Sequence, residues 1–139
     1  MTYVVDASVA VKWFVRENLH EEALGLLDRS ESLAAPDLIV TEATNIALKK
    51  VVRNEISREQ AHVITIAISR YIPTLHPSAD LAERALEIAL TLNHPVYDCI
   101  YLACAETIDG ILITADRKLC RSVHGSEFES LIRYLDDAG

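Results

Sequence analysis

The sequence predicts an α/β protein in which helices cover both faces of a mostly parallel sheet. Short apolar runs of strand length alternate along the 139 residues with longer stretches of helical period. No repeat, biased tract or linker divides the chain, and its length is that of one domain, so we expect a single domain over residues 1–139.

The first part of the chain predicts two strands separated by helices. An apolar strand ends at Val5, and helical patterning follows through Phe14. A second amphipathic stretch, Leu19–Arg29, precedes the short strand Leu33–Pro36, which proline stops. Asp37 then begins a helix whose apolar stripe is formed by Ile39, Ala43, Ile46 and Ala47.

The middle of the chain continues this alternation. Ser57–Gln60 has the S-x-x-Q form of a capping box, and the helix that it starts is expected to reach about Tyr71. A short strand at Ile72–Leu75 and an amphipathic helix at Ser78–Leu92 follow.

The last part predicts the most buried elements. Pro95 opens the helix Val96–Ile108, which is apolar almost all round and should therefore lie between other elements. Ile111–Thr114 is a compact strand, followed by the short basic helix Ala115–Arg121. Leu131–Leu135 fits a final strand, and a helix is the open alternative.

Composition excludes several classes of protein. Charged residues interrupt every apolar run well before the length of a membrane span, and the start of the chain has no basic signal-peptide region. The three cysteines, Cys99, Cys104 and Cys120, are an odd number without metal-site spacing, which favours the reducing cytoplasm. We expect Cys99 and Cys104 to be packing residues.

Four carboxylates mark the expected site. Asp6 directly follows the first strand, and Asp116 lies just beyond the strand Ile111–Thr114. Asp98 is in the first turn of the most apolar helix, and Glu42 is in the early turns of the helix after the second strand. Ligands of open parallel sheets bind beyond the carboxyl ends of the strands, where these acids fall.

Helix capping is the alternative role for such acids, worth typically 0.3–1 kcal/mol each, and we assign it to Asp37 and Asp80. Taken singly, Asp98 and Asp116 fit capping as well as function. However, both of them and Asp6 have apolar neighbours, where an unpaired charge costs several kcal/mol. Two unit charges about 4 Å apart repel by about 4 kcal/mol at an effective dielectric near 20. If the acids share one cleft, a bound Mg²⁺ or Mn²⁺ resolves the conflict, because these ions prefer oxygen ligands.

Four segments resemble the acidic motifs of a known family. In chain order they are Val4-Val-Asp-Ala-Ser8-Val-Ala-Val-Lys-Trp-Phe14, Ala35-Pro-Asp-Leu38 leading to Glu42-Ala-Thr-Asn45, Pro95-Val-Tyr-Asp98-Cys-Ile-Tyr-Leu-Ala103, and Leu112-Ile-Thr-Ala-Asp116-Arg-Lys-Leu119. Together they resemble PIN-domain ribonucleases, in particular the VapC-type toxins of type II toxin–antitoxin systems, over essentially the whole chain. Cys99 and Asn54-Glu55 depart from the family pattern without touching the acids.

This resemblance implies a three-layer α/β/α domain with a central parallel sheet of about five strands. It also implies a cytoplasmic Mg²⁺- or Mn²⁺-dependent endoribonuclease that hydrolyses RNA phosphodiester bonds with one or two ions per site. Glu42 would bridge metal and water or act as general base, and Asp6 and Asp98 would be the most direct metal ligands. The catalytic and metal-binding set is Asp6, Glu42, Asp98 and Asp116.

Three polar residues of the same motifs are expected to orient a carboxylate or a water: Ser8, Asn45 and Thr114. No histidine is required by this scheme. The five histidines share no ligand spacing, and we expect them to be loop or surface residues: His20, His62, His76, His94 and His124.

The net charge of −8 is unusual for a protein that binds RNA. Clusters of Lys and Arg follow the proposed acids along the chain, and they fit either phosphate contacts at the rim of the cleft or solvated helix faces. The candidates for phosphate contacts are Lys12, Lys49, Arg117 and Lys118, with Arg16, Lys50, Arg53 and Arg121 in the same clusters.

The resemblance further implies two protein partners. A cognate antitoxin would place its C-terminal segment as a helix in a hydrophobic cleft and a basic side chain in the acidic pocket. A homodimer is also usual in the family. One apolar group fits either the core or such a cleft: Trp13, Phe14, Leu24, Leu26 and Leu27.

Two other functions compete with the nuclease. An aspartyl phosphotransferase would use Asp6 as its nucleophile, although Ser8 occupies the position where that class has a second Asp. A non-catalytic module would keep the acidic pocket only to dock an Arg or Lys of a partner. The RNA target is left open by the sequence.

Overall fold

The computed structural model describes residues 1–29 and 31–138, and a five-stranded sheet forms its centre. The strand order is β3-β2-β1-β4-β5, and every neighbouring pair is parallel. The prediction of a parallel sheet of about five strands is therefore confirmed. The strands are β1 (Thr2–Val5), β2 (Ser32–Pro36), β3 (Thr74–His76), β4 (Ile111–Thr114) and β5 (Ile132–Tyr134).

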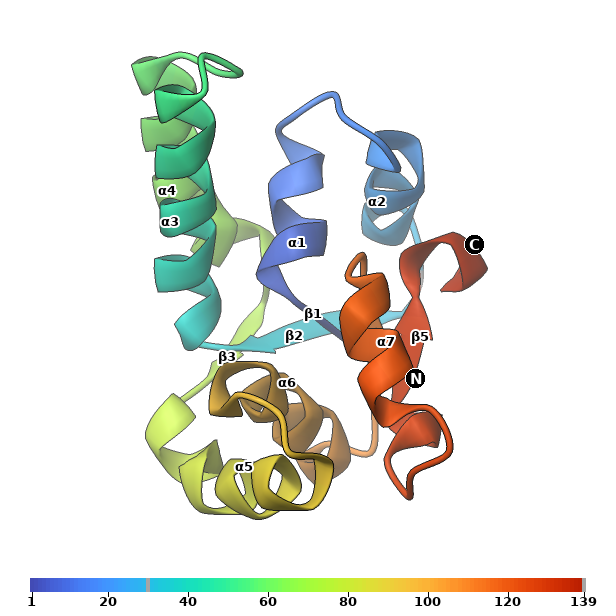
Figure 1. The fold of residues 1–139 in the computed structure, drawn as a ribbon. Helices are drawn as coiled ribbons and strands as arrows, with labels where there is room; N and C mark the ends of the chain where they lie inside the picture. The colour runs from blue at the N-terminus through green and yellow to red at the C-terminus, as the bar shows by residue number, and fades with distance from the viewer. Residues whose placement is uncertain (30, 139) are drawn as a thin grey trace.

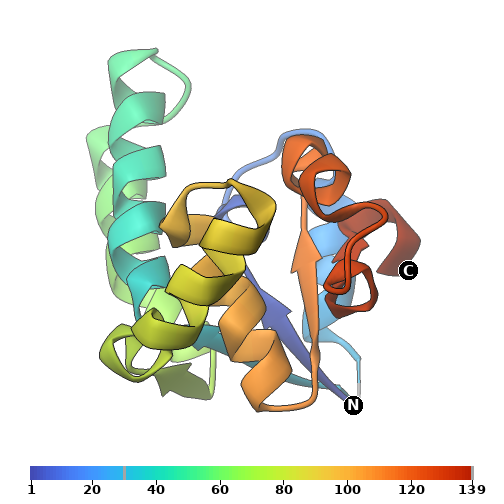
Figure 2. The ribbon, with the colours of Figure 1, turned by 60° about the horizontal axis from the view of Figure 1, so that its bottom comes forward.

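Helices cover both faces of this sheet, as Figures 1 and 2 show. One face carries α1 (Ala7–Ala10), the 3₁₀ turn η1 (Val11–Trp13), α2 (His20–Leu27), α3 (Leu38–Val52) and α4 (Arg58–Tyr71). The opposite face carries α5 (Ser78–Leu92) and α6 (Val96–Thr107), and α7 (Arg117–Val123) lies beside β5. Two further 3₁₀ turns, η2 (Glu129–Leu131) and η3 (Leu135–Ala138), flank β5.

The capping box predicted at the start of α4 is present. Ser57 Oγ accepts a hydrogen bond from Gln60 N at 3.1 Å, and Gln60 Oε1 accepts one from Ser57 N at 2.8 Å. These two bonds satisfy backbone amides that have no partner within the helix. They fix where α4 begins, so that α3 and α4 form the hairpin at one side of the molecule (Figure 1).

A glycine is required where α6 turns into β4. A Cβ on Gly110 would lie 2.5 Å from the carbonyl oxygen of Thr2. No side chain can occupy that space, because real Cβ contacts are longer. Gly110 thus lets the end of α6 pass close to the first residue of β1.

The core interpretation of the apolar group near the N-terminus is confirmed for Trp13 and Leu26. Both are buried, and Trp13 Nε1 donates to the carbonyl oxygen of Ala23 at 2.9 Å. Phe14 packs against Tyr71 with ring centroids 5.0 Å apart. Leu24 and Leu27 are partly buried against the same core.

The third strand begins two residues later than predicted. Ile72 ends α4 in an extended conformation with its side chain buried, and the strand itself begins at Thr74. Pro73 lies between them and has no backbone amide to donate to β2, so the hydrogen-bonded ladder begins only beyond it. For residues 131–135 the sequence left a strand and a helix open, and the structure has the strand β5 there, over Ile132–Tyr134.

The helix α6 is buried as predicted, from Cys99 through Ala105. Cys99 and Cys104 are free thiols within it, consistent with a packing role. Across residues 1–29 and 31–138, no helix combines the length and the apolar character that a membrane crossing requires.

Candidate active site

The strands that carry the first and last acidic motifs are neighbours at the centre of the sheet. β1 pairs with β2 on one side and β4 on the other. The C-terminal ends of β1 and β4 therefore form the switch point at which open parallel sheets bind ligands. Asp6 follows β1 directly, Asp116 lies two residues beyond β4, and the register pairs Val5 with Ile113.

Asp6 is buried, and both of its carboxylate oxygens accept hydrogen bonds. Ser8 Oγ donates to Oδ1 at 2.6 Å, Val9 N donates to the same oxygen at 3.2 Å, and Thr114 Oγ1 donates to Oδ2. The Thr114 hydroxyl also accepts from Asp116 N at 3.0 Å. Ser8 and Thr114 thus hold the Asp6 carboxylate in a fixed orientation and tie it to the end of β4.

Burial raises the pKa of Asp6 to about 6, and the nearby Asp98 carboxylate adds to the rise. The hydrogen bonds from Ser8 and Thr114 act in the opposite direction. A charged Asp6 is therefore held in the protein at a free-energy cost, which is typical of functional carboxylates.

Glu42, from the second turn of α3, contacts Tyr101 of α6. Tyr101 Oη donates to Glu42 Oε1 at 2.6 Å. Burial, together with the Asp98 charge, raises the pKa of Glu42, while the bond from Tyr101 lowers it. Burial and the Glu42 charge raise the pKa of Tyr101 far above its ordinary value, so the phenol stays protonated and donates.

Asp98, in the first turn of α6, is contacted by a histidine. His94 Nε2 lies 2.7 Å from Asp98 Oδ2, and only 11% of the histidine side chain is exposed. His94 is a loop residue, as expected, since it precedes α6; its contact with Asp98 was not predicted from the sequence. Its position four residues before Asp98 was the available signal.

Tyr101 was also missed as a site residue by sequence reasoning. It lies three residues after Asp98 on α6 and so faces the same side of the helix. A hydroxyl in an otherwise apolar helix was the signal, because a buried Tyr hydroxyl needs a hydrogen-bond partner.

All four predicted carboxylates line a single cavity of about 260 Å³. They come from four different parts of the chain: the end of β1, α3, α6 and the turn after β4. The predicted supporting residues Ser8 and Asn45 line it too, while Thr114 is fully buried behind Asp6. The complete lining is Asp6, Ala7, Ser8, Glu42, Asn45, Ile46, Lys49, Asp98, Tyr101 and Asp116.

The donors in this cavity suit a hard divalent cation. They are carboxylate and amide oxygens, and the cost of charging buried Asp6 beside Asp98 is what a bound cation removes. Among residues 1–29 and 31–138, no three His, Cys, Asp or Glu side chains stand close enough together to hold an ion as placed. Mg²⁺ needs only one or two direct carboxylates and keeps several waters, so the donor set fits the ion.

The four predicted phosphate contacts lie in different environments. Lys49 lines the acidic cavity, and Arg117 and Lys118 are exposed on α7. The prediction that Lys12 contacts phosphate is wrong. Its side chain is buried, and its ammonium pairs with Glu17 at 2.7 Å. Glu17 also pairs with Lys50 at 2.5 Å, so Lys12 belongs to an ion-pair cluster between η1 and α3.

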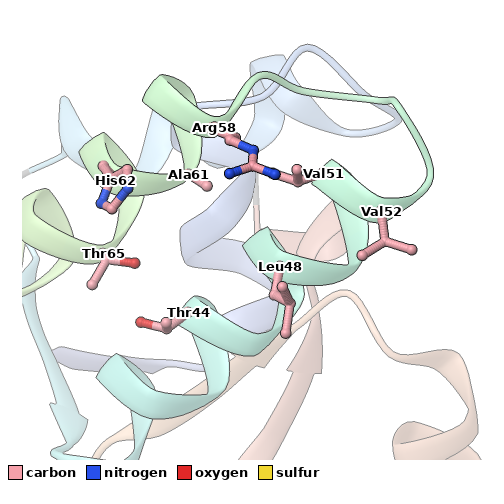
Figure 3. Close-up of a pocket in the computed structure, with 8 residues that line it drawn as sticks. All are labelled: Thr44, Leu48, Val51, Val52, Arg58, Ala61, His62 and Thr65. Atoms are coloured by element: carbon pink, nitrogen blue, oxygen red, sulfur yellow. The ribbon is translucent and has the colours of Figure 1, made fainter.

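A second cavity, of about 430 Å³, lies between α3 and α4 and contains none of the four acids. Figure 3 shows Val51 of α3 beside Arg58 of α4, with His62 further along α4. Leu48 and Val52 beside it are exposed. Its lining is Thr44, Leu48, Val51, Val52, Arg58, Ala61, His62 and Thr65.

The fold and this acidic cleft agree with comparisons to known proteins. A model of the PIN domain family matches residues 3–123. The chain belongs to the PIN-domain family.

Two similar sequences place the chain in a narrower group of PIN-domain proteins. Over 121 residues the chain is 31% identical to Ribonuclease VapC3 of Pyrobaculum aerophilum, covering 86% of this chain and 92% of the relative. Over 119 residues it is 34% identical to Ribonuclease VapC1 of Mycobacterium tuberculosis, covering 84% and 86%. Within the PIN domains, the chain is therefore a member of the VapC ribonucleases, as the sequence motifs predicted.

A solved structure shows the same fold. Protein PAE2754 from Pyrobaculum aerophilum superposes with a TM-score of 0.70 at 21% identity, covering 99% of this chain and 86% of that one. The three-layer PIN architecture predicted from the motifs is confirmed.

Proposed function

We propose that this protein is the endoribonuclease toxin of a toxin–antitoxin pair and that it hydrolyses RNA phosphodiester bonds at the four-carboxylate cavity. The observation that carries the proposal is the convergence of Asp6, Glu42, Asp98 and Asp116 on one cavity at the switch point of the sheet. Membership of the VapC ribonucleases supports the choice of RNA as substrate.

The proposed cofactor is Mg²⁺ or Mn²⁺, with one or two ions per site. Asp6 and Asp98 would hold it directly, with Glu42 and Asp116 acting directly or through water. When bound, such an ion neutralises the carboxylates, attracts the scissile phosphate and lowers the pKa of a water molecule.

The residues of the chain then have distinct roles. Ser8 and Thr114 fix the orientation of the Asp6 carboxylate by donating to its two oxygens. Glu42 receives the proton of the attacking water on its oxygen Oε2, because Oε1 already accepts from Tyr101. Its raised pKa makes it a stronger base than an exposed glutamate.

RNA contacts are proposed for the basic residues at the rim of the site. Lys49 lines the cavity itself, and Arg117 and Lys118 follow Asp116 on α7. The net charge of −8 opposes unspecific binding to the phosphate backbone and so favours a structured RNA target.

The proposed partners are a cognate antitoxin, which would insert a basic side chain among the carboxylates, and a second copy of the chain. Light scattering of the purified protein tests the homodimer. A cytoplasmic location is proposed on the three free thiols, since a reducing compartment keeps them unpaired.

The aspartyl phosphotransferase alternative is not favoured by the geometry. Ser8 occupies the position where that class has a second Asp, and its hydroxyl donates to Asp6 Oδ1 instead of supplying a further carboxylate.

The test of the proposed function is cleavage of a folded RNA by the purified chain. We expect cleavage with Mg²⁺ or Mn²⁺, none with EDTA, and a loss of at least about a hundredfold in Asp6→Asn. The control Asp28→Asn changes an exposed carboxylate at the end of α2 and should cleave at the wild-type rate. Metal-independent cleavage, or wild-type rates in Asp6→Asn, would contradict the proposal. Tight antitoxin binding without any cleavage would favour the non-catalytic module.

A further inference from the structure

A basic cavity lies beside the acidic one. It has a volume of about 380 Å³ and is formed by α7 and β5, which lie side by side (Figure 1). Two arginines and a histidine line it in a chain whose net charge is −8. The lining consists of Arg117, Cys120, Arg121, His124 and Tyr134.

The two guanidinium groups of this cavity are available to an anion. None of the ion pairs among residues 1–29 and 31–138 involves Arg117 or Arg121. By contrast, Arg84 pairs with both Glu87 and Glu106. A free guanidinium offers a planar fork of donors that matches two phosphate oxygens.

Arg117 is also held in place by an aromatic ring. Its Cζ lies 4.0 Å from the centroid of Tyr134. An arginine over a ring face loses little further freedom on binding, and its N–H edge stays open. Arg121 is four residues further along α7 and so projects on the same side as Arg117.

The basic cavity adjoins the catalytic one. Asp116 caps α7 by accepting from Lys118 N and Leu119 N, so the helix begins at a proposed catalytic carboxylate. Cys120, a wall residue of the basic cavity, donates its backbone amide to the carbonyl oxygen of Asp116 at 3.2 Å. α7 has seven residues and is about 10 Å long, which is the rise of roughly three stacked nucleotides.

We propose that the cavity between α7 and β5 is a phosphate subsite for the RNA strand next to the scissile bond. This inference rests on the proposed function. Arg117 and Arg121 bind backbone phosphate there, within a few nucleotides of the cut, and counter the repulsion between RNA and an acidic protein. RNA is favoured over an acidic peptide because Arg117 directly follows Asp116, one of the four carboxylates proposed to act on RNA.

The test is RNA binding measured without cleavage. A short fluorescein-labelled single-stranded RNA is titrated with Asp6→Asn protein in Mg²⁺ at several salt concentrations, and anisotropy gives Kd. Arg121→Gln and Arg117→Gln are compared with Arg70→Gln, a matched control because Arg70 is an exposed arginine in the last turn of α4. Circular dichroism checks that each variant is folded.

We expect each cavity variant to weaken RNA binding about three- to tenfold and to reduce the slope of log K against log salt by about 0.7. Arg70→Gln should change neither. Arg121→Lys should keep the slope but lose part of the affinity, because it keeps the charge and loses the fork. With Asp6 intact, Arg121→Gln should raise KM while kcat stays within about twofold.

Wild-type affinity and slope in both cavity variants would overturn the inference. So would variants that lose affinity only for an acidic protein partner, since the occupant would then be a peptide. If the wild-type chain cleaves no RNA, the proposed function fails while the binding series still tests the subsite. If the wild-type chain cleaves RNA and the cavity variants keep the unchanged salt slope, only the subsite fails.

Discussion

Replacing Asp6 by asparagine should make the metal-free protein more stable at neutral and alkaline pH while it abolishes activity. The native protein binds a proton on Asp6 more tightly than the unfolded chain does, because burial raises the pKa from 3.8 to about 6. The charged carboxylate therefore costs nothing below pH 3.8, costs progressively more up to pH 6, and costs a constant amount above it.

The magnitude follows from that shift. A rise of about two pH units at 1.36 kcal/mol each gives up to about 3 kcal/mol above pH 6. Asparagine keeps one acceptor oxygen but offers a donor where Thr114 now donates, which offsets about 1 kcal/mol. We expect Asp6→Asn to be about 2 kcal/mol more stable than wild type at pH 8 in EDTA and about 1 kcal/mol less stable near pH 4, where the cost of the charge is gone and only the lost hydrogen bond remains.

Urea unfolding followed by circular dichroism at several pH values measures this difference. Asp28→Asn, at an exposed position, is the control and should show a small difference that does not depend on pH. If Asp6→Asn is as stable as wild type or less stable at pH 8, with no pH-dependent gap, then Asp6 is not held as a costly buried charge and the reasoning fails.

Three further outcomes are expected. In a thermal-shift assay, Mn²⁺ should raise the Tm of the wild-type protein more at pH 8 than at pH 5, because protons compete with the ion for Asp6. Equal rises in Tm at both pH values would argue against Asp6 as a ligand. His94→Ala should weaken Mn²⁺ binding about tenfold by calorimetry, with His94→Gln closer to wild type, since the imidazole orients Asp98; an unchanged Kd in the alanine variant would make the contact incidental. Gly110→Ala should destabilise the protein by about 1–3 kcal/mol in urea, whereas Gly25→Ala, where a Cβ meets nothing within 4 Å, should not; equal stabilities would show that the turn can shift.

The order and type of the elements were predictable because their signals are local. The capping box at Ser57 and the proline before α6 act within one helical turn. The start of β3 was not predicted correctly, because it depends on which residues can donate to β2, and that is decided across the sheet by Pro73.

In the candidate site, too, local motifs were readable from the sequence and contacts between distant elements were not. The four acids were predicted from their motifs, and the fold brings them to one cavity. The contacts of Tyr101 with Glu42 and of His94 with Asp98 were missed, since the first joins α3 to α6 and the second is made from the loop that precedes α6. Lys12 was misassigned for a related reason: its partner Glu17 lies beyond the helical pattern, in a connection whose path the sequence does not reveal.

The hydrogen bond from Thr114 to Asp6 joins positions 108 residues apart. During translation Asp6, the first of the four cavity carboxylates, is made long before the strand that orients it. A nascent chain that ends before β4 therefore has Asp6, Glu42 and Asp98 but lacks both Asp116 and the hydroxyl that orients Asp6. Until β4 has been made and has docked beside β1, the Asp6 carboxylate lacks one of the two hydroxyl donors that orient it.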